Sequence, residues 1–379
     1  MQWVPSHYQA THDMSALPFH YDELCQVVKV TPTISGNQMR LKLTNRFGRH
    51  VLLFDDVQVA STPHFTAAQQ ITSHYQPQII IPEHSVIRTD PVTFPIKVGQ
   101  PVYIKMIANH PQEYVDFAST YQTTLTNAAL SRQSDFIPPL TERWRNRKGW
   151  FSLESLEVSS SINPVYVEIT GDSLVESGMV VAELIRNFNQ SNPNQLCWLQ
   201  TGISGNQLCH DAPMEEPLYE TFGRSLLKRL QKSTLRPNMT IAIIGTNDLI
   251  LPFYSKTMAE QNVTPQEIIS GYQELAAICR ARQSKVLTTT IAPFRLFDLP
   301  DPLPAEQIIT SQRRTINAWL RQRSWIVDGA RQLRDAHDNL LTKYDFGDHL
   351  HWSPAGGQEI AKLLIPQVKN WLNEKKNSR

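Results

Sequence analysis

The stretch that most restricts the fold of this chain reads PVYVEITGDSLVESG over residues 164–178. Val165, Val167 and Ile169 form a β-branched run that is long enough for a buried strand and too short for a helix. A glycine-containing turn follows, and apolar residues then recur at helical spacing. This order predicts one unit of a parallel sheet. Ser173 would lie at the carboxyl edge of that sheet, where open α/β folds carry their chemistry.

The same alternation of strand and helix continues to the end of the chain. Further strands are expected at 196–199, 239–244, 286–291 and 325–327. Helices are expected around 219–230, from a capping box at 264–267, over 309–320, and from Ser353-Pro354 to about Trp371. Five strands with intervening helices predict a flavodoxin-like, doubly wound α/β domain over residues 161–379.

Residues 1–160 have a different pattern, which is typical of antiparallel β-structure. Alternating or apolar runs predict strands at 39–43, 51–59, 94–98, 102–106 and 150–158. Proline and glycine separate these runs, as short antiparallel strands require. The segment 110–149 is less regular, and its basic cluster around Trp144 is interpreted as a solvated loop with a packed tryptophan. The N-terminal part is therefore expected to be an all-β sandwich or jelly-roll, without a residue grouping suited to catalysis.

Composition excludes several classes of protein. The net charge of +1 gives no electrostatic reason to expect nucleic acid or an anionic membrane surface as a partner. No apolar run approaches the ~20 residues that a membrane-spanning helix needs, and no secretory signal is visible. The four cysteines are scattered without a CxxC pair, so neither zinc nor a disulfide framework is expected. A cytoplasmic protein without a metal or other cofactor is the prediction.

A set of residues at the predicted strand ends fits acyl transfer. Ser173 in GDS can be the nucleophile, and His351 in DHLH can be the base, because imidazole exchanges protons near neutrality. Asp348, three residues before His351, can orient the ring. The amides of Ser173 and of Gly205 in GISGN, with the side chain of Asn247 in GTND, can converge on an oxyanion.

Neighbours of these groups are candidates for the wall of a substrate pocket. They are Asp172, Leu174, Asn206, His210 and His349. An ordinary loop role remains open for His210, and His349 is interpreted as a loop residue or a substrate contact.

With these four blocks in place, the chain resembles the SGNH, or GDSL, hydrolases. The resemblance covers most of residues 161–379, and the segment 39–60 is similar to the N-terminal β-domain of a two-domain subgroup. It implies a serine esterase without metal, with Ser173, Asp348 and His351 as its catalytic residues, in a three-layer α/β/α domain. One departure is Gly178, which stands five residues after Ser173 where the family usually has glycine four residues after it.

Other interpretations stay open at this point. The segment from Asp345 to His351 could bind zinc, although no second His/Asp cluster supplies further ligands. A catalytically inactive carbohydrate-binding protein is a second alternative, which the intact set of three catalytic residues disfavours. The favoured substrate is a small carboxylic ester with a short acyl group, such as an acetylated sugar; a lysophospholipid or thioester is the alternative. Assembly into a homo-oligomer is left open.

Overall fold

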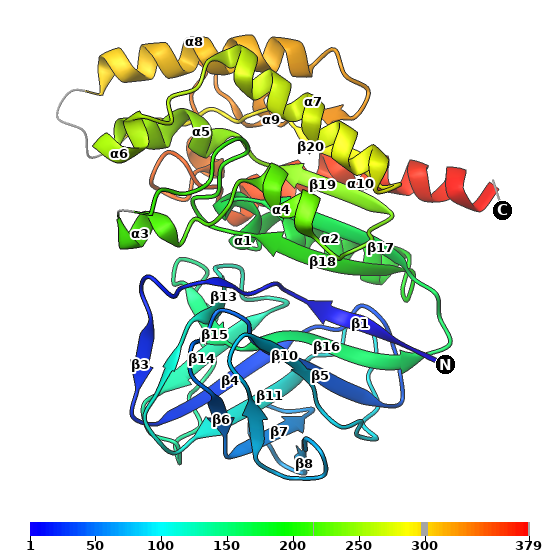
Figure 1. Ribbon diagram of the computed structural model, residues 1–379. Coiled ribbons are helices and arrows are strands. Elements are labelled where there is room, and N and C mark those ends of the chain that lie inside the picture. Colours follow the sequence, from blue (N-terminus) through cyan, green and yellow to red (C-terminus); the bar gives the residue numbers. More distant parts are fainter. Residues whose placement is uncertain (215, 297–301, 378–379) are drawn as a thin grey trace. The chain divides into compact units, whose positions relative to one another are not determined.

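The computed structural model describes residues 1–214, 216–296 and 302–377, and its contacts divide the chain into two compact units (Figure 1). Unit 1 comprises Met1–Val167 and Phe188–Thr201. Unit 2 comprises Glu168–Asn187 and Gly202–Arg379. The grouping thus adds residues 188–201 to the N-terminal part, and the expected domain boundary at residues 160 and 161 stays a prediction.

The two largest sheets of unit 1 are antiparallel. Their strands are β1 (Gln2–Tyr8), β4 (Leu24–Val30), β5 (Met39–Asn45), β7 (Asp56–Ala60), β8 (Gln69–Gln70), β10 (Ser85–Arg88), β11 (Val102–Ala108), β14 (Asn127–Ser131) and β16 (Leu153–Ser160). One sheet has the order β1-β16-β5-β10 and the other β14-β4-β11-β7-β8. Both contribute fully buried side chains to one core, including Leu41, Val28 and Ile104. The predicted β-sandwich is therefore confirmed.

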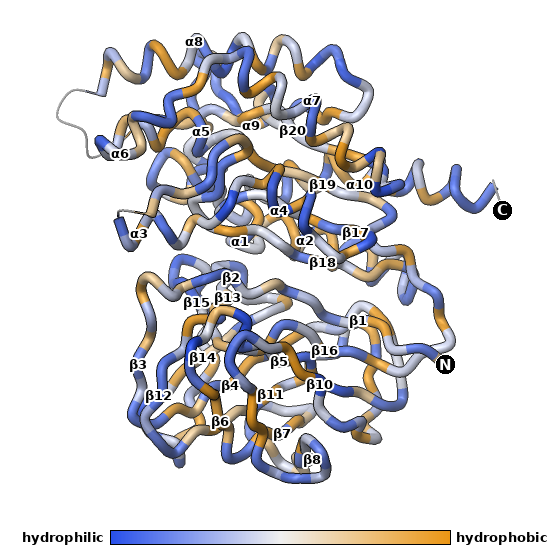
Figure 2. Tube along the Cα trace, viewed as in Figure 1, coloured by the Kyte–Doolittle hydropathy of each residue, from blue (hydrophilic) through white to orange (hydrophobic). Residues whose placement is uncertain are grey.

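Shorter strands complete unit 1. They are β2 (His12–Asp13), β3 (Phe19–Tyr21), β6 (Leu52–Phe54), β9 (Ile79–Ile81), β12 (Gln112–Tyr114), β13 (Asp116–Thr120) and β15 (Lys148–Phe151). They pair as β12-β3, β15-β13-β2 and β6-β9. In Figure 2, hydrophobic residues of this unit are concentrated along its strands.

Two sequence predictions in this unit are wrong. Residues 94–98 do not form a strand, and only an isolated bridge pairs Ile96 with Gly36. Pro91, Pro95 and Pro101 flank or interrupt the run, and proline has no N–H to donate to a ladder. The segment 110–149 is more regular than its polar sequence suggests, because it contains β12, β13 and β14.

A five-stranded parallel sheet follows, as predicted. Its strands are β17 (Val165–Gly171), β18 (Leu196–Gly202), β19 (Met239–Ile243), β20 (Lys285–Thr289) and β21 (Ile326–Val327), in the order β18-β17-β19-β20-β21. Strand β19 is buried along its whole length, as a strand covered on both faces must be. The three strands that precede the GDS, GISGN and GTND blocks are thus adjacent in the sheet.

The long helices are α2 (Met179–Ser191), α7 (Pro265–Ala281), α8 (Leu303–Leu320) and α10 (Pro354–Asn377). The short ones are α1 (Ser173–Glu176), α3 (Pro217–Glu220), α4 (Leu226–Lys232), α5 (Thr246–Ile250), α6 (Lys256–Ala259), α9 (Gly329–Leu333), η1 (Leu251–Phe253) and η2 (Thr342–Tyr344). Side chains of α4, α7 and α8 share one core with Ala242 of β19. Helix α10 meets α2 and α9 closely: Gly357 lies against the backbone of Met179, and Gly329 against Ile360. The result is the expected α/β/α layering.

The observed ends of the helices can be compared with the capping signals predicted from the sequence. Helix α7 opens with the predicted capping box, because Thr264 accepts from Glu267 N–H and Glu267 accepts from Thr264 N–H. Helix α10 begins at Pro354, as predicted, and extends beyond Trp371 to Asn377. The prediction of a single helix at 219–230 is wrong. The chain forms α3 and α4 instead, because Gly223 turns to a φ of +72° and Ser225 caps a new helix.

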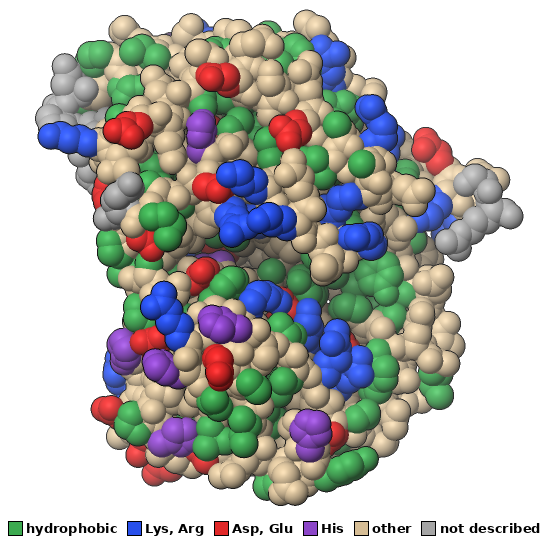
Figure 3. All heavy atoms as spheres, in the orientation of Figure 1, with side chains coloured by type: hydrophobic (Ala, Val, Ile, Leu, Met, Phe, Trp, Pro, Cys, Tyr) green, Lys and Arg blue, Asp and Glu red, His purple; other side chains and the backbone are tan. Residues whose placement is uncertain are grey.

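Surface charge, membrane-spanning helices and cysteine pairing can each be compared with the sequence predictions. Basic and acidic side chains are interspersed on the face of each unit drawn in Figure 3. No helix within residues 1–214, 216–296 and 302–377 is long and apolar enough to cross a membrane. All four cysteines are free thiols.

Candidate active site

Ser173 is the first residue of α1, two residues after β17 ends. The turn between them needs glycine at position 171. Gly171 has a φ of +145°, and a Cβ placed there would lie 1.8 Å from the carbonyl oxygen of Ile243 on the neighbouring strand. That close approach leaves no room for a side chain. The chain therefore reverses tightly at the sheet edge and leaves Ser173 only half-buried.

Asp172, immediately before Ser173, caps this helix. Its Oδ1 accepts the Leu174 N–H at 2.9 Å, and its Oδ2 is buried without a partner among the described residues. Burial raises the pKa of Asp172 to about 7, although the Leu174 N–H and the nearby His351 oppose the shift. Both Asp172 and Leu174 are buried. Both side chains therefore lie in the interior next to Ser173, where they support the turn.

The segment 345–352 carries the second half of the constellation. Asp345 pairs with Trp352 in an isolated bridge, and Phe346 N–H donates to His351 O, which closes a tight hairpin. Inside it, Asp348 Oδ1 accepts the backbone N–H of His351 at 2.8 Å. Asp348 Oδ2 lies 2.7 Å from His351 Nδ1. The other ring nitrogen, Nε2, lies 2.8 Å from Ser173 Oγ.

These contacts set the charge of Asp348. Burial alone would raise its pKa, but hydrogen bonds from the His351 ring and backbone, together with the attraction of the ring, outweigh that effect and hold the pKa at about 2. The carboxylate is therefore ionised at neutral pH and can only accept hydrogen bonds. His351 Nδ1 must then carry the proton in their bond. When the ring carries only that proton, Nε2 is the acceptor for Ser173 Oγ–H.

The candidate oxyanion donors lie at three adjacent strand ends. In the described part of the chain, the N–H groups of Ser173 and Gly205 donate to no protein acceptor. Gly205 has a φ of +76°, and its Cα faces the Phe222 ring so closely that a Cβ would lie 2.2 Å from it. Asn247 Nδ2 donates one N–H to Asn206 O at 3.0 Å. That bond fixes the amide plane, and the amide has a second N–H to offer.

A buried layer supports these donors. Asn206 Nδ2 donates to Phe222 O and Arg224 O, while Asn206 Oδ1 accepts from Arg229 at 2.8 Å. Burial lowers the pKa of Arg229 to about 10, so it stays charged. Asn206 is fully buried. It therefore anchors the loop from beneath the surface.

His210 and His349 lie in different surroundings. Burial raises the pKa of Asp248, and the nearness of half-buried His210 opposes that shift. His349 has its own carboxylate: Nδ1 lies 2.7 Å from Asp345 Oδ2, and the ring is 60% exposed. His349 also adopts a φ of +59°. The hairpin thus holds two Asp–His pairs, of which His351 is the one in contact with Ser173.

Sequence reasoning missed two of the groups found here. Asp345 orients His349, and Glu176 accepts the Ser204 N–H at 2.6 Å next to the Gly205 donor. The i, i+4 spacing of Asp345 and His349 was the available signal for the first pair. Among the described residues, no group of three or more His, Cys, Asp and Glu is arranged to hold a metal ion.

Comparison with known proteins places this site in a family. The profile of the GDSL-like lipase/acylhydrolase family matches residues 169–358. A comparison with curated proteins gave no match. Among solved structures, a GDSL-like lipase from Bacteroides thetaiotaomicron is 20% identical over 54% of this chain and 88% of its own, with a TM-score of 0.39. An acetylxylan esterase from Geobacillus stearothermophilus is 18% identical over 55% and 96%, with a TM-score of 0.41. The profile covers half of the sequence and includes every residue of the constellation, so the chain belongs to the GDSL-like lipase/acylhydrolase family and is a carboxylic ester hydrolase.

Proposed function

We propose that this protein hydrolyses small carboxylic esters through an acyl-enzyme formed on Ser173. The observation that carries the proposal is the continuous chain from Asp348 through His351 to Ser173, with contacts of 2.7 and 2.8 Å. Both distances are within the range of a nucleophile and a base that share a proton. The ionised state of Asp348 supports the same assignment, because a carboxylate stabilises the imidazolium that forms during attack.

The proposed reaction has two halves. Ser173 Oγ attacks the ester carbonyl while His351 Nε2 takes the hydroxyl proton, and the C–O bond to the alcohol breaks as His351 returns that proton to the leaving oxygen. Water then attacks the acyl-enzyme with His351 as base, which releases the acid and restores Ser173. The N–H groups of Ser173 and Gly205 and the side chain of Asn247 would stabilise both oxyanions. One such donor is typically worth ~2.7–4 kcal/mol of barrier.

The proposed substrates carry short acyl groups, and an acetyl group on a sugar is the favoured example. Lysophospholipids and thioesters are the alternatives. Initial rates over p-nitrophenyl esters from acetate to octanoate, with acetylated sugars and a lysophospholipid beside them, would rank these substrates directly.

Replacement of the nucleophile tests the proposed function itself. Ser173→Ala should lower turnover of p-nitrophenyl acetate by at least about a thousandfold and abolish labelling by a fluorophosphonate, because no other group can form the acyl-enzyme. The matched control is Ser177→Ala in the next turn, where the hydroxyl bonds to Leu174 O. A folded Ser173→Ala protein that kept more than a few per cent of activity would contradict the proposal. A protein that bound carbohydrate but formed no fluorophosphonate adduct would favour the inactive alternative.

A further inference from the structure

The loop that carries the Gly205 donor is held by a carboxylate from the helix of the nucleophile. Ser204 N–H donates to Glu176 Oε2 at 2.6 Å, and Glu176 is only 3% exposed. A bond of this length from a backbone amide to a carboxylate is of the charge-assisted kind, which is stronger than a bond between neutral groups.

The other amides of this loop are also engaged, with one exception. Ile203 N–H donates to Gly171 O at 3.0 Å, and Asn206 N–H donates to Ile203 O at 3.1 Å. Ser204 N–H is bound to Glu176. The described residues hold no acceptor for the N–H of Gly205. The amides on both sides of Gly205 are therefore held by acceptors, while its own N–H remains available to a ligand.

The position of Glu176 in the sequence couples the two backbone donors. It lies three residues after Ser173 on the single turn of α1, where residues three apart share a face. This turn therefore carries the nucleophile, its own N–H donor, and the carboxylate that holds the second donor's loop. We infer that Glu176 is a positioning residue, which sets the orientation of the Gly205 N–H towards the oxyanion; the inference rests on the esterase mechanism proposed above.

Two variants at position 176 and one control test the inference. Glu176→Ala removes the acceptor, Glu176→Gln keeps a neutral acceptor of the same shape, and Glu183→Gln changes a glutamate of α2 that is paired with Arg186. The measurements are kcat and KM for p-nitrophenyl acetate and the inhibition constant of a phenylboronic acid, whose adduct with serine is tetrahedral. A misplacement of about 1 Å at a reacting centre can cost roughly a hundredfold in rate.

We expect Glu176→Ala to lower kcat by about tenfold to a hundredfold with KM within about threefold of wild type. Boronic acid affinity should fall in step with kcat. Glu176→Gln should lie between Glu176→Ala and wild type, and Glu183→Gln should match wild type. Hydrogen exchange at the Ser204 amide should quicken in both Glu176 variants, which reports the loosened loop independently of turnover.

A folded Glu176→Gln protein with unchanged kcat, boronic acid affinity and Ser204 exchange would overturn the role, even if Glu176→Ala failed to fold. Equal losses in kcat/KM for Glu176→Ala and Glu176→Gln, with weaker substrate binding and unchanged boronic acid affinity, would also overturn it. A wild-type protein that hydrolysed no ester and bound no boronic acid would refute the proposed function, and this role with it. Wild-type behaviour of the Glu176 variants beside an active wild type would refute this role alone.

Discussion

Two histidines in one hairpin offer a sharp test at the scale of single residues. His351→Ala should lower kcat by about a thousandfold or more, because its Nε2 is the group in contact with Ser173 Oγ. His349→Ala should retain turnover within about tenfold of wild type, since its ring bonds to Asp345 and is largely exposed. Steady-state kinetics on one ester decides between them. Equal damage from both substitutions would mean that the two Asp–His pairs act together, and the assignment of His351 as the sole base would be wrong.

Asp172 predicts an unusual pH dependence of stability. Its pKa in the folded protein is about 7, above the ordinary value of 3.8, because its carboxyl is buried. Between these two pH values the folded state holds a proton that the unfolded state has lost, so the free energy of unfolding should fall as pH rises from about 4 to about 7. Asp172→Asn keeps the acceptor for Leu174 N–H without the charge. We expect it to flatten this part of the curve, as measured by urea unfolding at pH 4.5, 6 and 7.5.

If the free energies of unfolding of the wild type and of Asp172→Asn changed in parallel over that pH range, Asp172 would not hold the proton.

Asp348 should affect stability at the acidic end of the pH range. Its pKa lies at about 2, below the ordinary 3.8, so the stability that it contributes is present above about pH 4 and is lost as pH falls towards 2.

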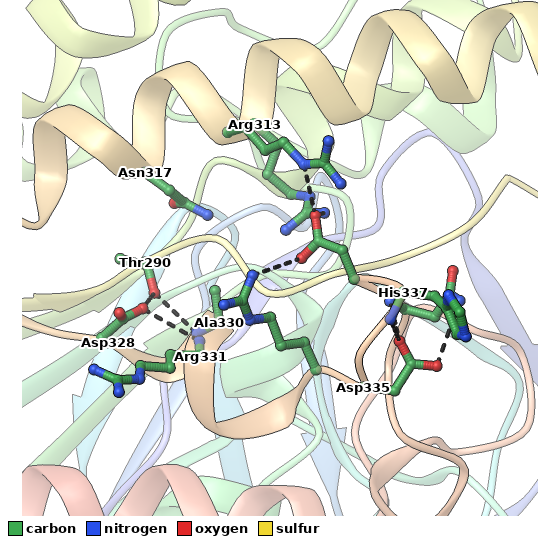
Figure 4. Close-up of polar contacts among 12 residues, drawn as sticks. Thr290, Arg313, Asn317, Asp328, Ala330, Arg331, Asp335 and His337 are labelled. Carbon is green, nitrogen blue, oxygen red and sulfur yellow. Dashed lines mark hydrogen bonds and ion pairs between the residues drawn. The ribbon is translucent and has the colours of Figure 1, made fainter.

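At the scale of secondary-structure elements, a buried ion pair holds α8 to the loop that leads to the hairpin. Arg313 projects from α8 (Figure 4). Its side chain is 3% exposed and donates to Asp338 Oδ2 at 2.8 Å. Arg314 donates to the same oxygen from the exposed side, at 2.9 Å. Burial by itself would raise the pKa of Asp338, and the two arginines reverse that effect and lower it.

The different burial of the two arginines predicts that losing each ion pair lowers the free energy of unfolding by a very different amount. Asp338→Asn should destabilise the protein by ~3 kcal/mol or more, because it leaves the Arg313 guanidinium buried without its counter-charge. Asparagine suits the φ of +66° at this position, so backbone strain does not enter. Arg314→Ala should cost less than ~1 kcal/mol, as exposed ion pairs do. Denaturant unfolding measures both, and similar costs would contradict the distinction drawn from burial.

The same elements show which parts of the structure could be predicted from the sequence and which could not. The strand ends and the α7 capping box were predictable because a local pattern determines each of them. The helix expected at 219–230 failed because Gly223 adopts a positive φ, which nothing in the apolar spacing reveals. Glu176 could not be found at all. The role proposed for it depends on a contact with Ser204, 28 residues away, and on burial of a residue type that is usually exposed.

At the scale of the whole molecule, unit 1 draws on residues from both halves of the sequence. Gln9 pairs with Gln200 in a parallel bridge, and Ala10 N–H donates to Gln200 O at 2.9 Å. Ser35 N–H donates to Asn194 Oδ1 at 2.7 Å. The segment 188–201 therefore has backbone partners within residues 1–167, and no local pattern in the sequence predicts them.

A chain that begins at Ser161 would lack those partners. We expect this shortened protein to unfold at a lower temperature than the full chain and to aggregate, because β18 would expose unpaired backbone groups and apolar surface. Differential scanning fluorimetry and size-exclusion chromatography test this directly. If the shortened protein were as stable as the full chain and matched it on every ester, residues 1–160 would contribute neither to stability nor to substrate choice.

The contact between Ser173 and His351 joins residues that are 178 positions apart. At a synthesis rate of 5–20 residues per second, the ribosome finishes the serine roughly 9–36 s before it reaches the histidine. On the proposed mechanism, the growing chain during that interval has the nucleophile Ser173 but not yet His351, the base that would activate it. On that mechanism, a chain whose synthesis stops before His351 would have no esterase activity.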